Sequence, residues 1–152
     1  MFKKQIFEPI VAYVYVIEFK KWGLQHAHFL IILKTNAKLI APESFYRVAC
    51  VELPNKTTHE NLYLAVIRHM LHGPCGYLNL NNVCMKKKNG KCRNDYHKPF
   101  CSKTIQGKNS YPKYRQRNDG QKIRIREVDL DNRWVVPNNP YLLTKFDCHI
   151  NV

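Results

Sequence analysis

Residues 11–34, VAYVYVIEFKKWGLQHAHFLIILK, decide the fold of this chain. The stretch contains two runs, 11–19 and 25–34, that are rich in β-branched and aromatic residues and apolar on both faces. Runs of this kind are typical of central strands in a sheet that is covered on both sides. The linker between them is short, and a loop at Lys21-Trp22-Gly23 with Gly23 in a left-handed conformation predicts a β-hairpin.

The middle of the chain predicts a further strand and a helix. Residues 47–53 (RVACVEL) predict a third strand. Residues 57–60 (TTHE) fit a capping box, and the apolar residues that follow recur at helical spacing, which predicts a helix ending near His72. Residues 75–119 have the composition of loops.

The last third is less regular. Residues 122–126 (KIRIR) predict a short strand after a turn at 118–120, and the apolar tail is broken by Pro137 and Pro140. The whole pattern predicts an α+β fold. We expect a mainly antiparallel sheet with helices on one face and a cysteine-rich, basic insertion at about 72–101.

Length and composition limit the possible classes. The chain has 152 residues, of which 45% are hydrophobic, so one domain with a real core is expected. It has no apolar run of about 18 residues, and its first residues do not resemble a secretory signal. We therefore expect no membrane contact, and six cysteines that serve as thiols or metal ligands rather than disulfides.

Positive charge is concentrated in the second half. Lys and Arg outnumber Asp and Glu by 25 to 11, and residues 86–126 hold 14 basic residues against 2 acidic ones. A polyanion is the expected partner, and Tyr96, Phe100, Tyr111 and Tyr114 could stack on unpaired bases. A solvated basic face is the alternative. The candidate DNA contacts are Lys86, Lys87, Lys88, Lys91, Arg93, Lys113, Arg115, Arg117, Arg124 and Arg126.

The His-Ala-His sequence of the second run forms a candidate metal site. His26 and His28 are two residues apart on a strand, so both side chains leave the same face. With a three-residue loop, Glu18 lies opposite His26 and shares that face. Two imidazoles and a carboxylate, with coordination positions left open, suit a divalent cation that also takes oxygens from a phosphate. Histidines that are simply hydrogen-bonded on a strand are the alternative.

Several stretches together resemble the HUH endonuclease (helicase-like) domain of Helitron transposon proteins. The likeness covers most of the chain and includes VYVIEFKKWGLQHAHFLIIL (14–33), HMLHGPCG (69–76), YPKYRQR (111–117), LDNRWVVPNNPYLL (130–143) and HINV (149–152). The chain has Trp22 and Gln25 where the family commonly has Arg and Pro.

The resemblance implies a rolling-circle replication initiator that acts on single-stranded DNA in the nucleus. In that family the histidine pair and a nearby acidic residue hold Mg²⁺ or Mn²⁺, and a tyrosine attacks the phosphodiester. This implies metal ligands at His26, His28 and Glu18.

The resemblance also implies where the nucleophile lies. The family's catalytic tyrosines follow the HINV segment, so we expect the tyrosine beyond Val152 and no catalytic residue within the chain. Tyr141 belongs to the LDNRWVVPNNPYLL stretch and is not expected to be the nucleophile. Residues 1–152 are therefore expected to form a single partial domain.

The sequence has no P-loop motif, so a helicase domain is expected only in a full-length protein. The main alternative is a non-catalytic, zinc-stabilised remnant that binds nucleic acid. A degenerate reading frame without a selected role is a third possibility.

The cysteine-rich insert offers a second metal site. His72, Cys75, Cys84 and Cys92 supply four soft or borderline ligands in a stretch with few other means of folding. A tetrahedral Zn²⁺ would stabilise such an insert. His97 and Cys101 are reserve ligands, and ordinary reduced cysteines are the alternative.

Overall fold

The structure is a computed structural model that describes residues 7, 9–19, 25–37, 41–85, 90–107 and 111–152. The chain divides into two compact units, residues 1–40 and residues 41–152, and each is described by itself. Among the described residues, no helix is long and apolar enough to cross a membrane.

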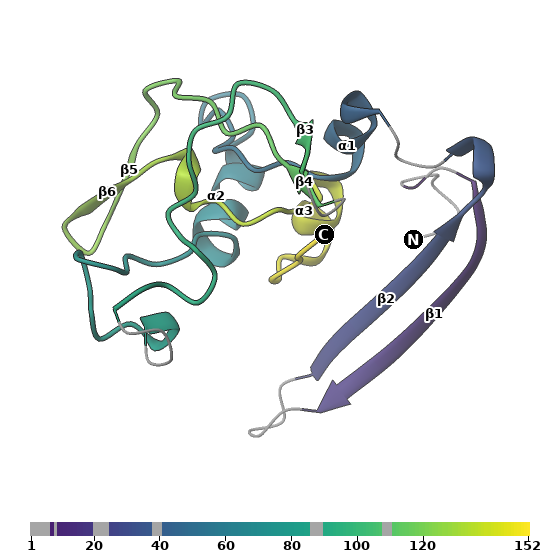
Figure 1. The fold of residues 1–152 in the computed structure, drawn as a ribbon, viewed down its shortest axis with the longest axis horizontal. Coiled ribbons are helices and arrows are strands. Elements are labelled where there is room, and N and C mark those ends of the chain that lie inside the picture. The colour runs from purple at the N-terminus through teal and green to yellow at the C-terminus, as the bar shows by residue number, and fades with distance from the viewer. Residues whose placement is uncertain (1–6, 8, 20–24, 38–40, 86–89, 108–110) are drawn as a thin grey trace. The chain divides into compact units, whose positions relative to one another are not determined.

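The first unit is the predicted hairpin. β1 (Ile10–Phe19) and β2 (Gln25–Leu33) pair antiparallel (Figure 1), which confirms both strands. A 3₁₀ turn (Thr35–Ala37) follows. The predicted loop at 21–23 lies outside the described residues.

The register of the hairpin gives each face a row of apolar pairs. Val14 lies opposite Leu30 on one face, and Tyr15 lies opposite Phe29 on the other. The prediction of central strands in a covered sheet is wrong for the part that the structure describes, where β2 pairs with β1 alone and most of these side chains are exposed. The apolar pattern indicates that both faces of the strands are suited to burial, but it does not predict which segments cover them.

The predicted third strand at 47–53 is wrong. Its first residues end α1 (Pro42–Val48), a helix that has Pro42 in its first turn, where the missing N–H costs nothing. Most residues after the helix are buried, and the half-buried Cys50 forms an isolated bridge with Asn138. A short apolar run that is buried throughout looks the same in sequence whether it forms a strand or not.

The predicted helix is confirmed as α2 (Glu60–His69), although its cap is wrong. No side chain caps its N-terminus; instead the Asn55 side-chain oxygen accepts the backbone N–H groups of Thr57 at 2.9 Å and Thr58 at 3.0 Å. Asparagine often closes a turn onto its own following backbone in this way.

A third helix, α3 (Pro140–Phe146), lies in the tail and packs beside α2 (Figure 1). The side chain of Asn139 caps it by accepting the N–H of Leu142 at 2.9 Å. Pro140 therefore begins a helix rather than breaking a segment. The buried cluster shared by these helices includes Val66, Met70, Val135 and Leu143.

The remaining elements are short. The strands are β3 (Ile105–Gln106), β4 (Pro112–Lys113), β5 (Ile123–Ile125) and β6 (Val128–Leu130), and the 3₁₀ turns are Val83–Met85 and Asn132–Trp134. β5 confirms the strand predicted at 122–126. The described strands form three separate two-stranded antiparallel sheets, so the α+β class is confirmed and the single main sheet is wrong.

Candidate metal centre

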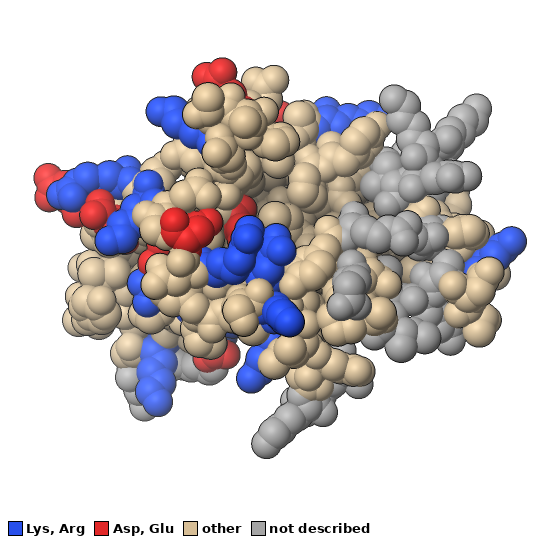
Figure 2. Space-filling model, turned by 90° about the horizontal axis from the view of Figure 1, so that it is seen from above, with Lys and Arg blue, Asp and Glu red and all other residues tan. Residues whose placement is uncertain are grey.

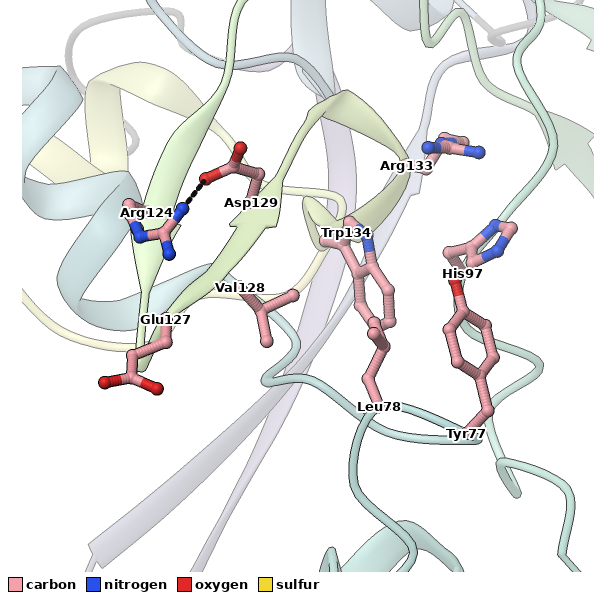
Figure 3. A pocket seen from close by; sticks show the side chains of 9 residues that line it. All are labelled: Tyr77, Leu78, His97, Arg124, Glu127, Val128, Asp129, Arg133 and Trp134. Carbon is pink, nitrogen blue, oxygen red and sulfur yellow. Dashed lines mark hydrogen bonds and ion pairs between the residues drawn. The ribbon is translucent and has the colours of Figure 1, made fainter.

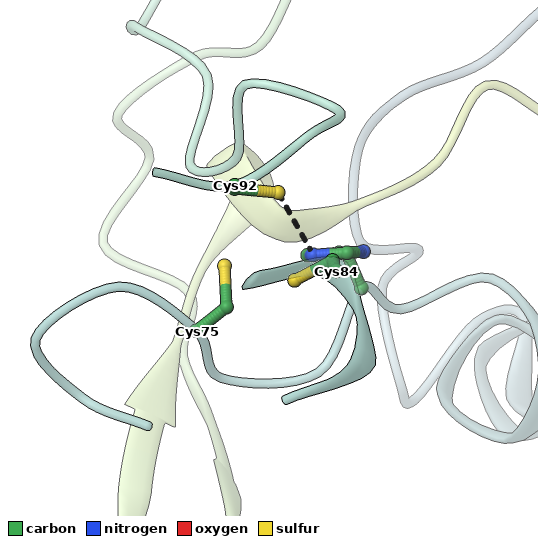
Figure 4. A group of neighbouring side chains, drawn as sticks. Cys75, Cys84 and Cys92 are labelled. Carbon is green, nitrogen blue, oxygen red and sulfur yellow. Dashed lines mark hydrogen bonds between the residues drawn. The ribbon is translucent and has the colours of Figure 1, made fainter. Parts of the chain in front are cut away.

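The four residues predicted from the cysteine-rich insert lie together in the second unit. One nitrogen of His72 and the sulfur atoms of Cys75, Cys84 and Cys92 all lie within 4.8 Å of one another, and the three thiols converge (Figure 4). His72 Nε2 lies 3.4 Å from the sulfur of Cys92. Cys101 is not in the group; its thiol donates to the carbonyl of Lys103.

Backbone contacts from three segments position these ligands. The N–H of His72 donates to the carbonyl of Trp134 at 2.9 Å, next to a bridge between Leu71 and Val135. The N–H of Arg93 donates to the carbonyl of Cys84 at 3.0 Å. The first bond ties the start of the insert to the turn at 132–134, and the second joins two loops of the insert, so ligands up to 20 residues apart in sequence come close together.

The surroundings of His72 keep a nitrogen lone pair available. Burial, and then the positive charges of Lys98 and Arg93, lower the pKa of His72, so its ring is neutral at pH 7. The ring stacks on Tyr96 with centroids 4.2 Å apart. Burial raises the pKa of this tyrosine to about 12, so it stays neutral. A neutral, oriented imidazole is the form that binds a metal.

The three thiols differ in how readily they lose a proton. Burial, together with the neighbouring Cys92 and Cys84, raises the pKa of Cys75 to about 12, and burial also raises the pKa of Cys84. Burial acts in the same direction on Cys92, but hydrogen bonds from the backbone of Tyr96 and Asn94 and from the thiols of Cys84 and Cys75 together outweigh it and lower its pKa. Cys92 is therefore the first thiolate of the group.

The donor set fits a closed tetrahedral metal site. Sulfur atoms bound to one Zn²⁺ at about 2.3 Å lie about 3.8 Å apart, and the ligand atoms of this group all lie within 4.8 Å of one another. Three thiols and one imidazole are the ligands of a structural Cys₃His site. The group can therefore hold a metal ion such as zinc. Among the described residues, no other group of three or more His, Cys, Asp or Glu side chains converges in this way.

The hairpin of the first unit has the predicted register around its histidines. Glu18 lies opposite His26, and Val16 lies opposite His28, as a three-residue loop requires. The rings of His26 and His28 have centroids 4.9 Å apart, so they share a face. Glu18 Oε2 lies 3.3 Å from His28 Nε2. The carboxylate thus pairs directly with one imidazole, but the ligand atoms of the three side chains do not converge as those of the Cys₃His group do.

The HINV segment places Val152 against the residues that precede α3. The N–H of Val152 donates to the carbonyl of Pro137 at 3.4 Å, and the residue is 40% exposed. The expectation that the catalytic tyrosine is not among residues 1–152 stays a prediction.

The predicted DNA-contact residues fall into two kinds. Arg115 and Arg117 both form ion pairs with the buried carboxylate of Glu52, and Arg124 pairs with Asp129 at 3.3 Å. The positive charge of these three residues is therefore partly neutralised by acidic residues of the same unit. The remaining described candidates are Lys91, Arg93, Lys113 and Arg126, while Lys86, Lys87 and Lys88 lie outside the described residues.

Basic groups are scattered over the face shown in Figure 2, and several lie beside acidic groups. Of the aromatic residues predicted to stack on bases, Tyr111 and Phe100 are exposed, and the guanidinium of Arg133 lies over the Phe100 ring. Tyr114 instead packs against the buried cluster around Val66, and Tyr96 packs on His72.

Sequence reasoning missed two partners of the metal group. Trp134 lies parallel to the His72 ring at 6.4 Å, and Tyr96 stacks on it directly. No spacing rule points to them, because both contacts join residues that are distant in sequence. No family model and no curated protein matches this chain.

Proposed function

We propose that this chain is part of a rolling-circle replication initiator of the Helitron HUH type, which binds single-stranded DNA beside a divalent cation. The observation that carries the proposal is the hairpin register, which puts Glu18 and His26 opposite each other with His28 on the same face. When complete, such a protein nicks and rejoins DNA through attack by a tyrosine.

The geometry of the hairpin suits a hard cation. Two ligands in neighbouring positions of an octahedral ion, each about 2.1 Å from it, lie about 3 Å apart. The 3.3 Å between Glu18 Oε2 and His28 Nε2 is close to that separation. One carboxylate and two imidazoles leave coordination positions for phosphate oxygens, and Mg²⁺ or Mn²⁺ would polarise the phosphodiester as a Lewis acid.

Charge supports the choice of a nucleic acid as partner. The formal charge of the chain is +14, and this electrostatic term attracts a polyanion whatever its sequence. The Cys₃His group would act as a structural site, holding an insert whose residues 72–101 include six Lys or Arg against one Asp.

Manganese binding to the whole chain tests the cation site. Electron paramagnetic resonance titration should show one Mn²⁺ bound to the wild type, with affinity reduced at least tenfold in His28→Ala. The matched control is His59→Ala, an exposed histidine on the other unit whose ring contacts Thr58. Equal Mn²⁺ binding by both variants would contradict the cation site.

A second candidate function is a non-catalytic, zinc-stabilised module that binds nucleic acid, and the convergent Cys₃His group favours it. Anisotropy of a labelled single-stranded oligonucleotide separates the two. The first function predicts that Mn²⁺ tightens binding in the wild type but not in His28→Ala. The second predicts binding that falls steeply with salt and is the same with and without Mn²⁺.

A further inference from the structure

A pocket in the second unit lies beside the metal group and is not explained by it. Its volume is about 360 Å³, within the range of roughly 300–1,000 Å³ that is usual for small-molecule sites. The residues around it come from the insert, the β5–β6 hairpin and the turn after it (Figure 3).

Aromatic and apolar side chains form one wall. Tyr77 is 84% exposed, whereas Trp134 is 3% exposed and forms the floor. His97 stands beside Trp134, with centroids 5.5 Å apart. Leu78 and Val128 complete this wall (Figure 3). A largely exposed tyrosine at the edge of an aromatic pocket offers a free ring face to a flat ligand.

The metal group positions this wall. Tyr77 follows Cys75 by two residues and stands in the turn that the bridge between Gly76 and Asn79 closes. The left-handed backbone of Gly76, with φ +68°, starts that turn. The side chain of Tyr77 is thus positioned by a turn that directly follows the ligand Cys75, and not by packing against neighbouring side chains.

Charged groups of both signs form the opposite wall. Arg124 pairs with Asp129 at 3.3 Å, and Glu127 lies beside them (Figure 3). Arg133, held by Asp131 with Nη2 to Oδ2 at 2.7 Å, lies apart from this pair on the side of His97 (Figure 3). The pocket therefore carries two guanidinium groups and two carboxylates, a balance that does not favour a bare anion but offers both donors and acceptors.

The hairpin tip at this wall has an unfavourable backbone. Arg126 and Glu127 form the two-residue loop of β5–β6, with φ of +48° and +65°. Such a turn favours Asn-Gly, because left-handed backbone is unfavourable for residues that have a larger side chain. Residues kept in strained positions are often found at functional sites.

We propose that this pocket binds a single unstacked nucleobase of single-stranded DNA, with one ring face on Tyr77. A base is flat, is neutral, and carries donors and acceptors on one edge, which matches an aromatic wall facing mixed charges. The site rests on the proposed function for its ligand, but its residues are separate from the hairpin of the first unit.

The test compares two labelled single strands of equal length, one with bases and one with abasic residues throughout. The wild type should bind the strand with bases about tenfold more tightly, because stacking of one base on one aromatic side chain typically increases affinity by about this factor. Tyr77→Ala should bind both strands alike. The matched control Tyr141→Ala removes a 40% exposed tyrosine from α3 and should keep the preference.

Tryptophan fluorescence gives a second readout. The chain has two tryptophans, so a Trp22→Phe background leaves Trp134 as the only one. The strand with bases should quench this signal and the abasic strand should not, and Tyr77→Ala should reduce the quenching.

The outcomes separate the two proposals. A wild type that binds both strands equally overturns the pocket and leaves DNA binding intact. A wild type that binds neither strand overturns the proposed function and the pocket together. Equal loss of preference in the Tyr77 and Tyr141 variants also contradicts the pocket.

Discussion

Glu52 accepts two hydrogen bonds from the guanidinium of Arg117, from Nε to Oε1 and from Nη2 to Oε2, each at 2.9 Å. Arg115 adds a third from Nη2 to Oε2 at 3.0 Å. This buried carboxylate ties the basic segment to the residues after α1. Two arginines that the charge pattern assigns to DNA therefore also hold the unit together.

Replacing Glu52 by Gln should destabilise the protein by about 2–3 kcal/mol, because two guanidinium groups lose their counter-charge at a buried site. Urea unfolding monitored by circular dichroism measures this. Glu60→Gln, at the exposed first turn of α2, is the control and should cost no more than about 0.5 kcal/mol. Equal effects of the two substitutions would contradict the role of Glu52.

The same carboxylate predicts an acid dependence. Burial acts to raise the pKa of Glu52, but hydrogen bonds and charge from Arg117 and Arg115 outweigh it and lower the pKa below its ordinary 4.5. Its stabilisation is complete above pH 4.5 and is lost as the pH falls through the folded-state value. Unfolding free energies measured from about pH 7 to about pH 3 should fall more steeply for the wild type than for Glu52→Gln. Parallel curves would count against this assignment.

Asn132 joins two distant segments and is fully buried. Its side chain accepts the N–H of Leu53 at 2.7 Å and donates to the carbonyl of Arg117 at 2.8 Å. Asn132→Ala leaves both groups without partners, so we expect a loss of about 2–4 kcal/mol in thermal or urea unfolding. Asn118→Ala, at an exposed position, should change stability by less than about 0.5 kcal/mol.

The hairpin tip should tolerate stabilising substitutions. Arg126→Asn with Glu127→Gly places the residues that this turn prefers at its two left-handed positions. The double variant should gain about 1–2 kcal/mol of unfolding free energy. Lys122→Asn, just before β5, serves as a control with no expected gain. A double variant no more stable than the wild type would show that the turn is not strained.

Zinc should stabilise the second unit through its Cys₃His group. Metal at about 1,000 times the dissociation constant adds about 4 kcal/mol of apparent stability. Cys92→Ser should abolish the thiolate-to-metal charge-transfer band of the Co²⁺ form, and Cys148→Ser, an exposed cysteine outside the group, should not.

Zinc affinity should also rise with pH. The raised pKa values of Cys75 and Cys84 mean that binding displaces protons from thiols. Proton release on zinc addition, measured in a weakly buffered solution, should therefore be positive at about pH 7. The absence of release would show that these thiols are not ligands.

Local patterns predicted the parts of the molecule in which neighbours in sequence are neighbours in space. The alternation around Glu18 and His26 predicted the hairpin and its register, because side chains on strands repeat every two residues. The predicted ligand set from His72 to Cys92 also converges. Pro140 after Asn139 marks a helix start as well as a break, so the pattern alone does not distinguish α3 from a broken segment.

Long-range contacts were beyond such patterns. Whether residues 47–53 form a strand depends on distant backbone partners such as Asn138. Whether Arg117 contacts DNA or forms an internal ion pair depends on Glu52, a carboxylate 65 positions earlier. The stacking of Tyr96 on His72 is of the same kind. Periodicity and turn chemistry determine which residues share a local face. Which residues meet across the core depends on how the whole chain packs. A buried polar group finds its hydrogen-bond partner only when all the segments around it are in place.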